Sequence, residues 1–143
     1  CEISMVDYIA SEEDIKLIMK YPHSSIISDS VYPIGGRPHP RMYGTYPRLL
    51  EKYVREEHVL TIEEAIKKIT SLPASVYGLK NKGVLKETMD ADIAIFDLNH
   101  IHTEATYEDP VNMARGFDYV FVNGILAVEH DKYTGQKAGC FMK

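Results

Sequence analysis

The spacing of apolar residues changes near Asn81-Lys82-Gly83, and this change limits what the chain can fold into. Before that point apolar residues recur on one face of a helix, and after it they alternate as in a half-buried strand. The sequence therefore predicts two regions, residues 1–82 with helices and residues 83–143 with a small antiparallel sheet. Taken alone, this order is that of an α+β chain.

The first region contains four helical patterns with recognisable ends. Ser11 with Asp14, and Thr61 with Glu64, have the spacing of helix-capping pairs. Proline suits the first turn of a helix, because its missing N–H has no partner there. The expected helices are 12–20, a helix from Pro47 closing at His58, 62–70, and a short one from Pro73 to Gly78.

The second region shows strand patterns separated by turn residues. Asn123-Gly124 is a two-residue hairpin signal, because both positions of the turn that fits strand twist need positive φ. The expected strands are 84–85, 93–96, 119–122 and 125–128.

A separate short apolar run, 24–27, is predicted to be a buried strand that ends at Asp29. The segment 30–41 that follows contains three prolines and two glycines, which exclude a regular helix or strand and predict a shaped loop. An acid at the carboxyl end of a strand, beside such a loop, is the usual position for the chemistry of barrel and open-sheet enzymes.

Composition excludes several classes of protein. A chain of 143 residues with 45% apolar and 26% charged residues can bury one ordinary core. The net charge of −5, with basic residues scattered among acids, argues against a nucleic-acid partner. No apolar run has the length of a membrane span, and Cys1 and Cys140 do not form a disulfide framework. We expect a cytoplasmic protein without a membrane or nucleic-acid partner.

Three motifs resemble one family of enzymes. SEEDIKLIMKYPHSSIISDS from Ser11, PHPRMYGTYPR from Pro38 and the closing VNG…TGQKAG are similar to the C-terminal part of the N-acyl-D-amino-acid deacylases (D-aminoacylases), in the metal-dependent amidohydrolase superfamily. The resemblance implies an α/β fragment: the last strand and helices of a (β/α)8 barrel, then part of a small β-sandwich. Since the chain begins at Cys1 without an initiator methionine, we interpret it as a C-terminal fragment.

The same resemblance assigns roles to site residues. Asp29 matches the catalytic aspartate, which takes a proton from the metal-bound water and returns it to the leaving nitrogen. Arg41 matches the arginine that holds the substrate carboxylate, and His39 is a second substrate-binding candidate. The alternatives are an Asp29 that caps a turn, an Arg41 in a structural ion pair or on the surface, and a His39 that orients Asp29 or bonds within its loop.

The resemblance also implies zinc in the full-length protein, with ligands mostly outside this chain. We expect no metal and no activity in the fragment alone, a small N-acyl amino acid as partner, and self-association through uncovered apolar faces. His100-Ile101-His102 has the superfamily's HxH metal pattern, but it follows a strand of the second region. We expect these two histidines to be solvated strand-end residues.

Two positions depart from the family pattern: Ser30 and Met89-Asp90 stand where glycine is usual. Glycine permits positive φ at little cost, and serine or aspartate adopts it less readily. The loop around Asp29 is therefore where the backbone can differ from the family pattern. Two other functions remain open. One is a noncatalytic β-rich interaction module. The other is a cyclic amidase of the hydantoinase or dihydroorotase kind, although the PHPR segment favours the deacylases over these enzymes.

Overall fold

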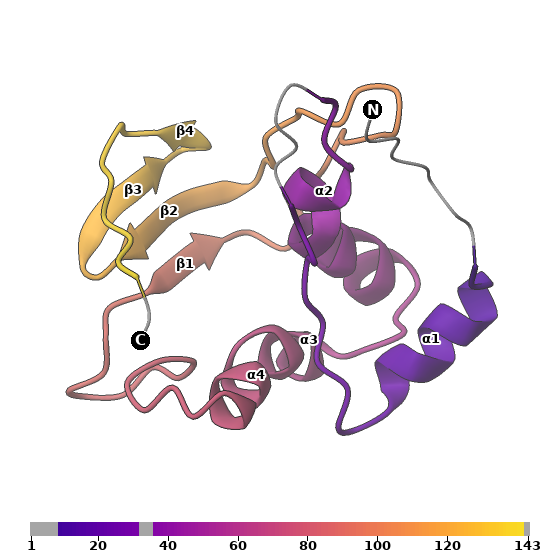
Figure 1. Cartoon of the computed structure of the whole chain (residues 1–143), viewed down its shortest axis with the longest axis horizontal. Helices are drawn as coiled ribbons and strands as arrows, with labels where there is room; N and C mark the ends of the chain where they lie inside the picture. The colour runs from indigo at the N-terminus through magenta and orange to yellow at the C-terminus, as the bar shows by residue number, and fades with distance from the viewer. Residues whose placement is uncertain (1–8, 32–35, 142–143) are drawn as a thin grey trace.

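The computed structural model describes residues 9–31 and 36–141, so part of the predicted 30–41 loop lies outside the described residues. Helices occupy one side of the molecule and a four-stranded sheet the other (Figure 1). The elements in chain order are α1 (Glu12–Lys20), α2 (Arg41–Arg48), the π-helix η1 (Leu49–Glu56), α3 (Ile62–Ile69), α4 (Ser71–Val76), β1 (Ile93–Phe96), β2 (Phe117–Val122), β3 (Ile125–Glu129) and β4 (Lys132–Tyr133).

Both predicted capping pairs are present. The Ser11 hydroxyl accepts the Asp14 N–H at 3.1 Å, and the Thr61 hydroxyl accepts the Glu64 N–H at 3.2 Å. In each pair the acid bonds back to the capping residue, which satisfies two helix N–H groups at once. The predictions of α1 and α3 are therefore confirmed.

The helix predicted to begin at Pro47 begins instead at Arg41, and α2 continues directly into η1. The N-cap residue is Pro40, which has no capping side chain. The cue that sequence reasoning missed is His39, one residue earlier, whose ring nitrogen Nδ1 accepts the first helix N–H, that of Arg41, at 3.0 Å and so acts as the cap. Pro47 lies inside the helix and has no N–H for the carbonyl of Tyr43. The wider π pattern starts two residues after it.

The sheet is antiparallel in the order β1-β2-β3-β4. Asn123 and Gly124 have φ of 49° and 77°, as the hairpin between β2 and β3 requires. A second hairpin, which the sequence reading missed, turns at His130 and Asp131 with φ of 46° and 63° and adds β4. Histidine and aspartate are weaker hairpin signals than Asn-Gly, which explains the miss.

Residues Val84 and Leu85, predicted as a strand, form none. The chain there makes a loop closed by Lys82, which pairs with Asp90 at 3.1 Å and with Asp92. Asp92 also accepts the Asn123 N–H at 2.7 Å, so the loop is fixed to the β2–β3 turn. The hydrogen bond from the distant Asn123 to Asp92 fixes the chain in this loop, against the local β preference of two apolar residues.

The segment 24–29 is also not a strand in this structure, which corrects the prediction. Ile26 donates one backbone hydrogen bond to the Lys68 carbonyl on α3, at 3.1 Å. A strand needs a neighbouring strand to pair with, and the described residues offer none beside this segment. The buried Lys68 ammonium holds the segment's start, donating to the carbonyls of Tyr21 at 2.5 Å and Ser24 at 3.1 Å. Burial lowers the pKa of Lys68.

One core joins the two predicted regions. It consists of Leu49, Leu50, Tyr53, Val54, Leu60, Ala65 and Ile101. Ile101 comes from the connection between β1 and β2, yet it is fully buried at 0% exposure among residues of η1 and α3. Division into regions 1–82 and 83–143 remains a prediction, and the two regions share this core.

Hydrogen bonds also hold the two regions together, between η1 and residues 98–103. The Arg55 guanidinium donates through Nη1 to the carbonyls of Leu98 at 3.0 Å and Ile101 at 2.6 Å. Glu51, one helical turn earlier, accepts from His102 Nδ1 at 2.6 Å and from the Thr103 N–H at 3.1 Å. We call these four bonds the η1 joint; they hold residues 98–103 against η1.

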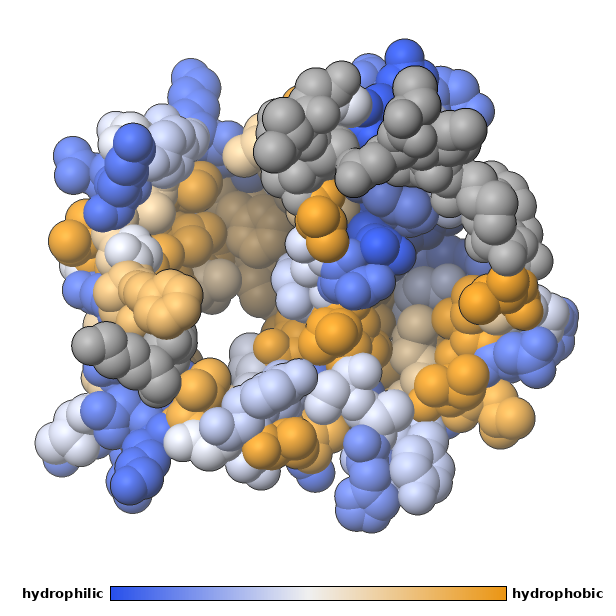
Figure 2. All heavy atoms as spheres, in the orientation of Figure 1, coloured by the Kyte–Doolittle hydropathy of each residue, from blue (hydrophilic) through white to orange (hydrophobic). Residues whose placement is uncertain are grey.

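Apolar side chains remain uncovered on this chain. Leu17, Ile18 and Tyr21 are exposed at the end of α1, and orange spheres gather there at the lower right of Figure 2. Among the described residues, no helix is long and apolar enough to cross a membrane.

The η1 joint predicts a stability effect that a surface arginine does not share. R55M keeps an unbranched apolar stem but removes the charged donor to the carbonyls of Leu98 and Ile101. We expect urea unfolding of this chain to show a loss of about 2 kcal/mol, the scale of hydrogen bonds to a charged group. R115M, at an exposed arginine paired with Glu104 on the surface, is the control and should cost less than about 1 kcal/mol. Equal stabilities of the two variants would contradict the joint.

Candidate functional site

The three predicted site residues lie together at the start of α2. Asp29 Oδ2 is 3.1 Å from Arg41 Nη2, and His39 accepts the backbone N–H of Arg41. Asp29 comes from the segment after α1. Arg41 is the first residue of α2, and His39 lies two residues before it. The fold thus brings a carboxylate and a guanidinium into direct contact.

Asp29 itself takes the strained backbone conformation at this site. Its φ is 46°, whereas Ser30, which stands where the family usually has glycine, has no positive φ. The positive φ thus falls on Asp29, and aspartate tolerates the left-handed region better than most residues. Ser30 does not need the freedom of a glycine, so it is compatible with this loop. At Met89-Asp90, the other position where glycine is usual, the preceding Thr88 has a φ of 72° and Asp90 pairs with Lys82.

The Asp29–Arg41 pair is open to solvent within this chain. The Asp29 side chain is 73% exposed and that of Arg41 42% exposed. Ion pairs of this kind contribute about 0–1 kcal/mol, since water and salt screen both charges. A carboxylate from a bound molecule can therefore compete with Asp29 for the guanidinium, and two parallel hydrogen bonds would favour it.

His39 is held in one neutral form. Because Nδ1 accepts the Arg41 N–H, that nitrogen carries a lone pair, and the ring proton of neutral His39 lies on Nε2. Burial of the ring and, second, the nearby Arg41 charge lower the pKa of His39. Of the alternatives for His39, the observed bond is one within its own loop, and it fixes the start of the helix that carries Arg41.

Tyr107 is a neighbour of the site that sequence reasoning missed. Its ring meets the His39 ring edge to face, with centroids 5.1 Å apart and planes at 79°. Tyr107 lies on the β1–β2 connection, far along the chain, and no local pattern links the two residues.

The HxH histidines do not share a site. His100 pairs with Asp97 at 2.8 Å, whereas His102 pairs with Glu51 at 2.6 Å. They are separated because Ile101, between them, is buried in the core. His100 is the solvated residue expected, while His102 has a structural role in the η1 joint.

The described residues do not make a metal centre by themselves. No group of three or more His, Cys, Asp or Glu side chains within 9–31 and 36–141 is placed to hold a metal ion. The site offers the Asp29 carboxylate and an imidazole whose Nδ1 is already occupied, and zinc requires three or four ligands. A metal here would need ligands from outside these residues.

Comparisons with known proteins agree on one superfamily. The chain is 36% identical over 132 residues to the D-aminoacylase of Alcaligenes xylosoxydans xylosoxydans, covering 92% of this chain and 27% of that protein. A dihydroorotase of Lactobacillus acidophilus matches a shorter stretch, 37% identical over 76 residues, 53% of this chain and 17% of that protein. The chain thus spans about a quarter of the length of the D-aminoacylase it matches.

Solved structures give the same result. A D-aminoacylase crystal structure superposes with a TM-score of 0.84 at 36% identity, over 90% of this chain and 27% of that one. An N-acyl-D-glutamate deacylase of Bordetella bronchiseptica, solved with zinc and a phosphonate inhibitor, gives 0.76 at 35% identity, over 82% and 24%. The amidohydrolase family model matches residues 9–125. With most of its length matched, this chain belongs to the amidohydrolase family.

Proposed function

We propose that this chain is the C-terminal part of a metal-dependent amidohydrolase that hydrolyses the amide bond of N-acyl-D-amino acids or related compounds. The observation that carries the proposal is the contact between Asp29 and Arg41 at 3.1 Å. Asp29 moves the proton, Arg41 binds the substrate carboxylate, and His39 positions Arg41. The fragment alone is inactive, since the ligands for zinc lie mostly outside it.

The substrate's chemistry explains why these two side chains must be neighbours. In an N-acyl amino acid, one carbon separates the scissile nitrogen from the α-carboxylate. A group that returns a proton to this nitrogen must therefore act within a few ångströms of the group that holds the carboxylate. Asp29 and Arg41 meet this condition, and Arg41 can bind a carboxylate with two parallel N–H donors.

Asp29 has the properties of a proton carrier in such a reaction. Its carboxylate accepts a proton from the attacking water and delivers it to the leaving amine. A divalent metal, when bound, lowers the pKa of water and polarises the amide carbonyl. Arg41 keeps the substrate aligned, and closure of the site by the remainder of the protein would remove the solvent that now screens Asp29.

The partners proposed for the whole protein follow from this function. They are a small N-acyl amino acid and zinc, in a cytoplasmic protein without a nucleic-acid or membrane partner. For the chain alone, exposed Leu17, Ile18 and Tyr21 support self-association. A cyclic amidase is the second candidate, supported by the dihydroorotase match over half of the chain.

The proton-carrying role predicts the effect of D29N in the complete enzyme. Asparagine keeps the size of the side chain but cannot carry a proton, so kcat should fall by at least about 100-fold. The change is measured with an N-acyl-D-amino acid at saturation, alongside circular dichroism to verify the fold. D118N, at an exposed aspartate of β2, should keep normal turnover. Wild-type turnover by D29N would reject the proton-carrying role of Asp29.

The binding role of Arg41 predicts a different kinetic signature. R41K keeps the charge but loses the planar pair of donors, so KM should rise about tenfold or more with a smaller change in kcat. R48K, at the other end of α2, is the control, because Arg48 is exposed and has no proposed role. Unaltered KM in R41K toward carboxylate-bearing substrates would remove Arg41 from the site.

The capping role of His39 predicts a pH effect on stability. Since its folded-state pKa is lowered, the unfolded chain takes up the proton first as pH falls below the ordinary value of 6.5. His39 therefore contributes stability above pH 6.5 that is lost on acidification toward its folded-state pKa. H39N offers a side-chain oxygen to the Arg41 N–H without titrating there, so urea unfolding should show a smaller loss between pH 7.5 and 5.

The H39N comparison needs a control, because carboxylates also titrate in this range. H23N, at an exposed histidine near Pro22, should leave the pH dependence as in the wild type. If H39N and the wild type lose stability in parallel, His39 does not supply the cap in its neutral form.

A further inference from the structure

We infer that Tyr107, from the β region, is a positioning residue of the substrate site: it fixes the His39 ring and, through it, Arg41. This inference rests on the proposed function and adds a residue to it that lies outside the helical region.

Tyr107 is part of a closed turn. The Thr106 N–H donates to the Asp109 carbonyl at 3.0 Å, and the Asp109 N–H donates to the Thr106 hydroxyl at 3.0 Å. Asn112 bonds the same Asp109 carbonyl through its amide at 2.9 Å. Although Tyr107 is 40% exposed, its backbone is therefore held on both sides.

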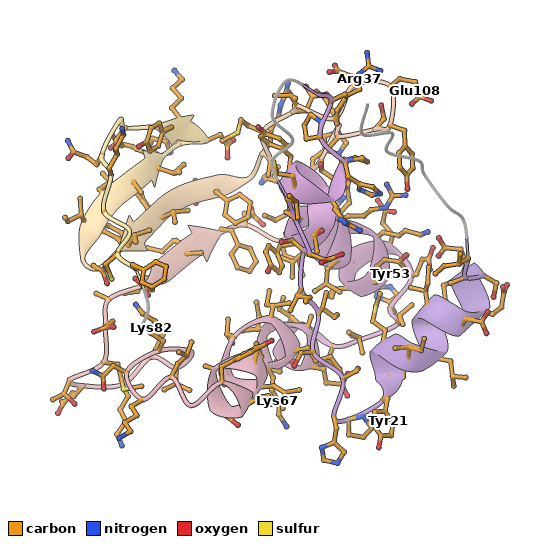
Figure 3. All side chains as sticks on the ribbon, in the orientation of Figure 1. Tyr21, Arg37, Tyr53, Lys67, Lys82 and Glu108 are labelled. Atoms are coloured by element: carbon orange, nitrogen blue, oxygen red, sulfur yellow. The ribbon has the colours of Figure 1, made fainter. Side chains whose placement is uncertain are left out.

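The connection carrying this turn packs on the helix that carries Arg41. A Cβ placed on Gly44 of α2 would lie 3.3 Å from the Thr103 hydroxyl and 3.4 Å from Ala105 Cβ. Ala105 is buried there, and the Thr103 N–H bonds to Glu51 as part of the η1 joint. In the view of Figure 3 the labelled side chains of Glu108, from this connection, and Arg37, from the segment before α2, both project at the upper edge of the molecule.

His39 lies between Tyr107 and Arg41. One nitrogen of its ring accepts the Arg41 N–H at 3.0 Å, and the Tyr107 ring meets it edge to face at 5.1 Å. Edge-to-face packing is a preferred aromatic geometry and restricts rotation of the imidazole. Without Tyr107 the ring can turn away from the Arg41 N–H, which leaves that N–H without its partner and loosens the start of α2 at Arg41. The Arg41 side chain then loses its fixed starting point.

This chain of contacts predicts an effect that depends on the substrate's carboxylate. In the complete enzyme, Y107L keeps apolar bulk but removes the ring. It should raise KM for an N-acyl-D-amino acid by about fivefold to tenfold, the effect of a small misplacement of a binding group. For the corresponding N-acyl-D-amino-acid amide, which has no carboxylate for Arg41 to hold, KM should change less than twofold. Y107F retains the ring that meets His39, so its KM for the acid should lie clearly below that of Y107L.

A control variant and a hydrogen-exchange measurement distinguish loss of the ring contact from a general loss of folded structure. Y77L, at an exposed tyrosine after α4, is the matched control and should leave both KM values unchanged. Hydrogen exchange at the Arg41 amide should be faster in Y107L than in Y107F. If Y107L does not fold, Y107M is used with the same expectations.

The inference is overturned if Y107L leaves KM unchanged for both substrates, if it raises both equally, or if Y107F behaves as Y107L does. R41K in the same assay separates this result from the proposed function. A raised KM in R41K with normal Y107L kinetics rejects the positioning role alone. Unchanged KM in R41K rejects the proposed role of Arg41 itself.

Discussion

The contact between η1 and residues 98–103 determines how the rest of this chain is arranged. Ile101 fills the core of the helical region, while Arg55 and Glu51 bond the backbone on either side of it. Buried apolar area supplies most of the stabilisation, and the charged groups fix the register because an unmatched carbonyl or carboxylate there would cost about 1–3 kcal/mol. The sheet is thus placed relative to the helices by one helix face.

That placement has consequences for the site. From the η1 joint the connection continues across Gly44 to Tyr107, which reaches the His39 ring. The helix that supplies Arg41 is therefore supported from both regions: its start by His39 and Tyr107, and its continuation by the core. Asp29 approaches from a third direction, on a segment that Lys68 and α3 hold by backbone contacts. This support fixes the backbone from which the Arg41 side chain extends toward Asp29.

Sequence reasoning succeeded where the signal was local. The capping pairs at Ser11 and Thr61 and the Asn123-Gly124 turn each depend on residues within a few positions, and all three are present. It failed where a distant partner decided the outcome. The expected strand ending at Asp29 has no neighbouring strand among the described residues, and the loop that contains Val84–Leu85 is fixed through Asp92 to Asn123 on the β2–β3 turn.

The same distinction applies to the candidate site. Asp29, His39 and Arg41 were found by motif and resemblance, and the structure brings them together; their roles in catalysis and binding remain proposals. The capping function of His39 was not expected, because histidine is an uncommon helix cap. Tyr107 could not have been found from spacing, since its approach depends on the whole path from η1 through the β1–β2 connection.

The central claim concerns the activity of the intact protein, and one assay tests it directly. The complete enzyme is given a panel of N-acyl-D-amino acids, their L-enantiomers and cyclic amides, before and after treatment with a chelator. We expect release of free D-amino acid, loss of this activity with the chelator, and recovery on adding zinc. Hydrolysis of the cyclic amides alone, or no hydrolysis of any acyl amino acid by metal-replete protein, would contradict the account.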